Sequence, residues 1–226
     1  MKNGSIAEFL ESARVLIENA RDVPFVAQAV AAYGYDGPRI QEGLATLVTA
    51  QTLVSRQAQD YGEAYEATEA LNRTWEADGT AYTRALKVAR VAFGSDPRAA
   101  GALKLPGRRK ESLVGWLEQT TPFYDNLLSD SALAATMASH GYPESRLREE
   151  QKLVAAVRQA VNLRLKESGE AQSATVARDK ALDVLDAWVI AFKAICRVAL
   201  ADDPQQLEKL GVVVLNQSRR RSKTKV

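Results

Sequence analysis

The chain has 226 residues, of which 46% are hydrophobic, 26% charged and only 7% aromatic, and its formal net charge is +2 at pH 7. This is the composition of an ordinary water-soluble globular protein, and its balance of residues favours helix over strand and excludes all-β folds. A single cysteine, Cys196, excludes a disulfide framework, and no run of about 18 uninterrupted apolar residues predicts a membrane span. The first residues, MKNGSIAEFL, lack the apolar run of a signal peptide, so the expected location is the cytoplasm.

The sequence repeats itself at one offset. A shift of 107 residues aligns residues 5–104 on residues 112–211 without a gap. Identical residues cluster in short blocks, such as Gly34-Tyr35 on Gly141-Tyr142. A fixed period of this kind indicates a duplicated unit. The sequence therefore predicts three parts: a first helical repeat over 1–105, a second over 106–218, and a basic disordered tail over 219–226.

Each repeat is expected to open with two helices. Apolar residues at three-and-four spacing predict an amphipathic helix over roughly 5–20. A shorter helix should follow from Pro24 and stop at Gly34, because a left-handed glycine followed by an apolar residue is typical of a Schellman ending. The second repeat predicts the same two helices 107 residues later, over 112–128 and from Ser131 to Gly141.

The longest segment of each repeat, 39–93 or 146–200, contains no proline and can be almost entirely helical. Its ambiguous point is a shared glycine, Gly62 or Gly169. Either each glycine forms the tip of a helical hairpin, or the helix runs straight through for about 55 residues and two antiparallel rods pair about a pseudo-twofold axis. We favour the rods, with the glycines allowing the two backbones to cross closely, and keep the hairpin as the alternative.

A short last helix is expected after each long segment. Asp96-Pro97 and Asp203-Pro204 place an N-cap acid before a proline at the first helical position. The last helix should extend to Leu103 in one repeat and to Leu210 in the other. Together the elements predict an all-α fold, an internally duplicated helical bundle with long antiparallel helices and pseudo-twofold symmetry.

Two pairs of tracts resemble a known family. They are YGEAYEATEALNRTWEA with ALKVARVAF, and SGEAQSATVARDKALDVLDAW with ICRVALADDPQQLEKLGV. They are similar to an uncharacterised bacterial family of duplicated, alanine-rich helical proteins, and the likeness covers nearly the whole chain. The resemblance implies an all-helical fold built from two related halves and carries no assigned activity, ligand or catalytic residue.

Metal and nucleophilic chemistry lack their usual residues. A di-iron site in a helical bundle needs Glu-x-x-His on two helices, whereas the chain has one histidine, His140, expected at a helix end. Cys196 falls on an apolar helix face and is expected to be a small buried residue rather than a reactive thiol. The phosphate-binding patterns GxxxxGK[ST] and GxGxxG do not occur in the sequence. We therefore predict no catalytic, cofactor-binding or metal-binding residue.

Charged residues shared by the repeats are expected to have structural roles. Glu63 and Glu170 are predicted to be solvated helix-surface glutamates, the alternative being a contact across antiparallel rods. Arg90 and Arg197 interrupt apolar faces near helix ends, where they can bond the last carbonyls or an acid.

Arg39 and Arg146 lie in the first turn of the long helices, where a cation opposes the helix dipole. The presence of an arginine at this position in both repeats suggests that each one pairs with a carboxylate. The nearest candidates are Glu42 and Glu149, so we expect a structural ion pair rather than a ligand contact.

Basic residues gather in the tail and in the linker between the repeats. Residues 219–226 carry five positive charges. The linker LKLPGRRKES adds Lys104, Arg108, Arg109 and Lys110. A solubilising end and a solvated linker are the favoured interpretation, because the sequence has no basic stripe interleaved with aromatic residues.

The three tryptophans follow the spacing of core residues: Trp75, Trp116 and Trp188.

These observations favour a non-enzymatic role for the chain, as a structural or protein-interaction protein that presents helical surfaces to an unknown protein partner. The first alternative is a weak binder of nucleic acid or of an anionic surface, acting through the tail and the linker. The second is a small-ligand binder with a pocket between the halves. No cofactor is predicted, and the oligomeric state is not predicted.

Overall fold

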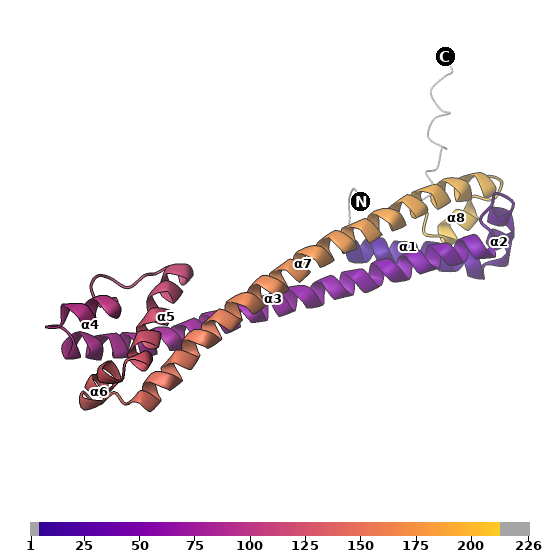
Figure 1. Ribbon diagram of the computed structural model, residues 1–226. Coiled ribbons are helices and arrows are strands. Elements are labelled where there is room, and N and C mark those ends of the chain that lie inside the picture. The colour runs from indigo at the N-terminus through magenta and orange to yellow at the C-terminus, as the bar shows by residue number, and fades with distance from the viewer. Residues whose placement is uncertain (1–4, 213–226) are drawn as a thin grey trace, which may run out of the picture. The chain divides into compact units, whose positions relative to one another are not determined.

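The computed structural model describes residues 5–212, and every regular element in that range is a helix (Figure 1). The elements in chain order are α1 (Ile6–Asp22), α2 (Pro24–Ala31), α3 (Gly37–Ala92), α4 (Pro97–Ala102), α5 (Leu113–Ser129), α6 (Ser131–Ser139), α7 (Glu144–Ala199) and α8 (Gln205–Lys209). The all-α prediction is confirmed. The predicted tail, 219–226, lies outside the described residues.

The chain forms two compact units, and both long helices contribute to each. The first unit takes the described residues up to 59 and those from 172 onward, and the second takes residues 60–171. Within each unit the start of one long helix packs with the end of the other, so α3 and α7 are antiparallel (Figure 1). Each unit therefore combines parts of both predicted repeats.

The helix ends follow local sequence signals. Ser5 forms a capping box with Glu8 at the start of α1, and Asp96 accepts two backbone N–H bonds at the start of α4. Gly34 and Gly141 both have positive φ, and the residue after each donates its N–H back across the turn to complete the predicted Schellman ending.

One capping prediction is wrong. Asp203 does not cap α8, which begins one residue later than expected, with Pro204 in the N-cap position and no side-chain cap bond. The Asp203 carboxylate instead accepts a bond of 2.9 Å from the side-chain amide of Gln206.

The long helices run through the two ambiguous glycines, as the rod alternative predicts. α3 and α7 each contain 56 residues without interruption. The reason given for the glycines is wrong, however. A Cβ atom placed on Gly62 or Gly169 would meet nothing within 4 Å, so neither glycine permits a close approach of backbones. The buried small residues nearby are alanines, Ala67 and Ala171.

The core of the first unit is apolar. α1 packs its buried face, which includes Leu16 and Ile17, against α3 and α7. Trp188 of α7 lies over Gly43 of α3, where a Cβ would overlap the indole ring. Tyr35 contacts that indole edge-on, with ring centroids 5.7 Å apart. This unit has no room for a side chain at position 43.

The core of the second unit is built around aromatic rings. Phe123 and Tyr124 of α5 are fully buried against Tyr82 of α3, with edge-to-face contacts. α5 is helical through Pro122, which lacks an N–H and so leaves the Glu118 carbonyl without its helical donor. The Lys104 ammonium donates to that carbonyl over 3.0 Å, replacing the missing bond.

The helix bounds have the same offset as the sequence repeat. α5 and α7 begin and end 107 residues after α1 and α3. A matching contact also recurs, since Asn19 of α1 donates to the carbonyl of Lys209, the last residue of α8, and Asn126 of α5 donates to the carbonyl of Ala102, the last residue of α4. The duplication itself stays an inference from the sequence.

Candidate functional site

Polar side chains enter the core of the second unit from α3 and α7. The Asp78 side chain is fully buried, and its Oδ2 accepts a hydrogen bond of 2.5 Å from the indole Nε1 of Trp116. Its second oxygen, Oδ1, has no hydrogen-bond partner among residues 5–212, and the same is true of the buried Tyr82 hydroxyl. Burial, together with the charge of Glu150, raises the pKa of Asp78 to about 6, against the opposing effect of the Trp116 bond.

Glu150 of α7 is the second buried carboxylate. It accepts hydrogen bonds from the hydroxyl of Tyr124 at 3.1 Å, from the hydroxyl of Tyr142, and from Nε of Arg146 at 3.2 Å. The Arg146 guanidinium also lies over the Tyr142 ring, 4.3 Å from its centroid. Burial raises the pKa of the Tyr124 and Tyr142 hydroxyls, so both remain protonated donors.

The corresponding positions of the first unit are apolar. At the 107-residue offset, Asp78 corresponds to Leu185, Tyr82 to Val189, Tyr124 to Ile17 and Glu150 to Gly43. In the first unit Trp188 lies over Gly43, the residue that corresponds to Glu150 at the sequence offset. The polar network is therefore not required to build this arrangement of helices. Buried groups with a shifted pKa, such as Asp78, are found more often at functional sites than elsewhere.

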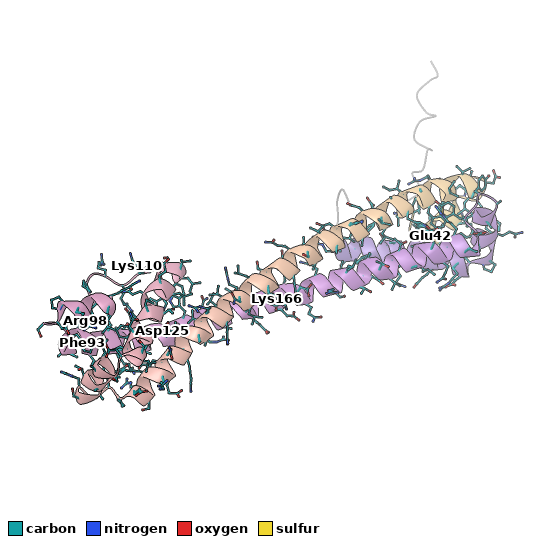
Figure 2. All side chains as sticks on the ribbon, in the orientation of Figure 1. Glu42, Phe93, Arg98, Lys110, Asp125 and Lys166 are labelled. Carbon is teal, nitrogen blue, oxygen red and sulfur yellow. The ribbon has the colours of Figure 1, made fainter. Side chains whose placement is uncertain are left out.

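An open cleft lies beside this network. Its volume is about 500 Å³, and it is lined by one face of α3, by the linker and by Trp116. The lining residues are Asn72, Trp75, Glu76, Gly79, Arg108, Arg109, Lys110, Glu111 and Trp116. Figure 2 labels Lys110 on the linker that leads from α4 to α5. Trp116 belongs to both features, because it lines the cleft and its Nε1 donates a hydrogen bond to Asp78.

The linker is held in place by hydrogen bonds to its backbone. Arg90 donates to the carbonyls of Leu105 and Gly107, and the Lys110 N–H donates to the Gln119 side chain over 3.0 Å. Arg109 donates to the Thr83 hydroxyl over 2.6 Å. The side chains of Arg108 and Lys110 are exposed, as the sequence predicts, but the backbone that presents them is fixed.

The remaining residues that stand out in the sequence have structural surroundings. Cys196 is buried in the apolar core of the first unit, which raises the pKa of its thiol to about 12. His140 is exposed at the end of α6, with Nδ1 2.9 Å from the Thr136 carbonyl. Glu63 and Glu170 are exposed, and Arg197 is exposed near the end of α7.

The predicted ion pairs are half right. Arg39 pairs with Glu42 at 2.9 Å, as expected. Arg146 pairs with the buried Glu150 rather than with Glu149, which instead binds Lys152. Both glutamates are helical neighbours of the arginine, and they differ in that Glu150 is buried in the core while Glu149 is exposed.

Sequence reasoning missed the polar network, although the repeat contains a signal for it. Asp78, Tyr124 and Glu150 are polar at positions where the other repeat has apolar residues or glycine. It also did not identify the residues that line the cleft, because Trp75 and Arg108 lie far apart in the chain and only the fold brings them to one surface.

Comparison of the chain with family models, curated proteins and solved structures finds no match. The resemblance to an alanine-rich bacterial family therefore stays a prediction. Within residues 5–212, no helix is both long and apolar enough to cross a membrane.

Proposed function

We propose that the protein is a non-enzymatic interaction protein that binds a partner helix along the long helices of its first unit. A groove of about 490 Å³ runs between α3 and α7 in that unit. On α3 it is lined by Glu42, Ala45, Thr46, Thr49 and Leu53, and on α7 by Ala177, Lys180, Ala181 and Val184. The proposal of a partner helix rests on this groove.

The lining of the groove recurs at helical spacing on both helices. Thr46, Thr49 and Leu53 are one turn apart along α3, on a different side from Leu47 and Ala50, which face the core shared with α1. Two antiparallel ridges with small residues between them form a groove into which a third helix can pack. The expected partner segment is an amphipathic helix with a narrow apolar stripe.

The buried network supports a non-enzymatic role. A general acid or base must come within hydrogen-bond reach of the reacting group. Asp78, Tyr82 and Tyr124 are fully buried within the core of the second unit, and Trp116 stands between Asp78 and the cleft. The network is better suited to holding Trp116 and the cleft wall in position than to chemistry.

Two exposed threonines of α3 provide a matched test. Thr49 lines the groove, whereas Thr52 lies outside it, and each hydroxyl donates over 2.8 Å to the carbonyl four residues earlier. In a quantitative pull-down from the native cell, Thr49→Arg should lose the specific partner and Thr52→Arg should retain it. A photo-crosslinker at position 49, but not at 52, should join the partner through a helical segment. Equal capture by both variants would contradict the proposal.

The nucleic-acid alternative is favoured by one observation, that Arg108, Arg109 and Lys110 of the linker share a cleft with two tryptophans. It predicts salt-dependent retention of the protein on DNA. Deleting residues 219–226 should abolish that retention if the tail is required. Retention that does not change with salt would exclude this alternative.

A further inference from the structure

The cleft of the second unit has the size and the lining of a small-ligand site. Its volume of about 500 Å³ falls within the range usual for such sites. Its lining comes from both predicted repeats, with residues 72–79 from the first and residues 108–116 from the second. All of these residues belong to one compact unit, so the cleft does not depend on the placement of the other unit.

The cleft has an aromatic wall. Trp75 is only partly buried, and its ring meets that of Trp116 edge-on, with centroids 6.4 Å apart. Trp116 also lines the cleft but is only 4% exposed. Part of the Trp75 surface is thus left open to the cleft, where a planar ring can stack.

Cations face this wall from the linker. Arg109 is held in place, with its guanidinium 5.7 Å from the Trp116 ring centroid and bonded to the Thr83 hydroxyl. Arg108 and Lys110 flank it on an anchored backbone. Two guanidinium groups and an ammonium are suited to a phosphate group, which guanidinium groups can bind in a bidentate manner.

The cleft also contains acceptors. Glu76 and Glu111 line it, and ionised carboxylates can only accept hydrogen bonds. A simple aromatic anion offers them no donor. A nucleoside phosphate offers hydroxyl groups and, on several bases, an amino group, together with a stacking ring and an anionic group.

From this combination we infer that the cleft binds a mononucleotide, with the base against Trp75 and the phosphate near Arg108, Arg109 and Lys110. This inference goes beyond the proposed partner helix, because it concerns the other unit and a small molecule. It also differs from strand binding, which the experiment tests separately.

Gly79 offers a clean way to block the cleft. A Cβ at this position would make ordinary contacts with Trp116, the nearest at 3.7 Å, so alanine fits. A leucine side chain would extend further, into the volume that the ligand needs. Both substitutions replace a glycine inside α3 and leave the charged and aromatic lining unchanged.

The experiment titrates the full chain with adenosine 5′-monophosphate by calorimetry and follows tryptophan fluorescence. The wild type and Gly79→Ala should bind with affinities within about threefold of each other, while Gly79→Leu should bind about tenfold more weakly or worse. Adenosine and inorganic phosphate should each bind more weakly than the nucleotide. Circular dichroism of the three proteins checks that the helix content is unchanged.

Three outcomes would overturn the inference. The first is no saturable binding of the nucleotide, or equal binding by Gly79→Leu with its fold intact. The second is competition by inorganic phosphate as strong as that by the nucleotide, which would leave a simple anion site. The third is tight binding of a single-stranded oligonucleotide that is lost in Gly79→Leu, with no binding of the mononucleotide, which would identify a strand-binding surface.

Discussion

At the scale of single residues, Asp78 is the most unusual group in the described part of the chain. A fully buried carboxylate is costly when ionised, and only one of its oxygens has a partner within residues 5–212. The folded-state pKa of about 6 lies above the ordinary value of 3.8, so folding favours the protonated form. The contribution of Asp78 to stability is therefore complete below pH 3.8 and is lost as the pH rises through about 6.

Replacing this carboxyl should remove the corresponding pH dependence. Between pH 4 and pH 7, the free energy of unfolding of Asp78→Asn should rise relative to the wild type by up to about 3 kcal/mol, at about 1.4 kcal/mol per unit of pKa shift. The amide can still accept the Trp116 N–H bond. Urea unfolding of both proteins at several pH values measures the difference. Parallel stability curves for the two proteins would show that Asp78 does not titrate in this range.

Two glycines of α3 should respond to alanine with opposite signs. At Gly43 a methyl group would overlap the ring of Trp188, whereas at Gly62 it would meet nothing within 4 Å. Gly62→Ala should gain about 1 kcal/mol of stability from helix propensity. Gly43→Ala has the same gain, but overpacking of about 1–3 kcal/mol opposes it, so a net loss is expected.

The difference between the two alanine variants isolates the clash, because the propensity gain is common to both. Gly62→Leu serves as the control. If the backbones crossed closely at Gly62, leucine would destabilise the protein strongly, whereas an open surface predicts a gain in stability close to that of alanine. Thermal unfolding of the three variants decides between these outcomes.

At the scale of elements, the local signals were predictable and the contacts between distant elements were not. Ser5, Gly34 and Asp96 each cap a helix or end it within a few residues of their own position, and for Gly34 and Asp96 the sequence predicts this role. The cleft beside Trp75 depends on packing between α3 and the linker that a linear pattern does not contain.

A comparison of equivalent positions in the two repeats nevertheless gives some information about the core. Positions that are apolar in one half and polar in the other, such as Leu185 and Asp78, mark the place where the two cores differ. The sequence could have pointed to the network in this way. It could not have paired Asp78 with Trp116, because 38 residues separate them.

A double-mutant cycle tests whether Lys104 replaces the helical hydrogen bond that Pro122 removes from α5. Lys104→Met removes the donor to the Glu118 carbonyl and should cost about 1 kcal/mol. Pro122→Ala restores the backbone N–H that donates to the Glu118 carbonyl in a regular α-helix. In the Pro122→Ala background, Lys104→Met should therefore cost less, with a coupling of about 0.5–1 kcal/mol. Additive effects of the two substitutions would mean that Lys104 does not replace the missing bond.

At the scale of the whole molecule, two separate cores share two long helices. Each unit has its own buried cluster, and each takes its long-helix segments from both α3 and α7. The stretches of helix between the clusters bury little. No side chain of residues 55–66 is buried, and in residues 162–170 only Glu167 is.

Helices that lack a buried face have little stability of their own in water, and local opening follows from low burial. Amide hydrogen exchange should therefore be about tenfold faster or more in residues 55–66 and 162–170 than in residues 82–89, where four side chains are buried. Gly62→Ala should slow exchange in the central segment of α3, because it raises helix propensity there, and should leave residues 82–89 unchanged. Uniform protection along both helices would instead mean that the central segments gain their stability from contacts other than buried side chains.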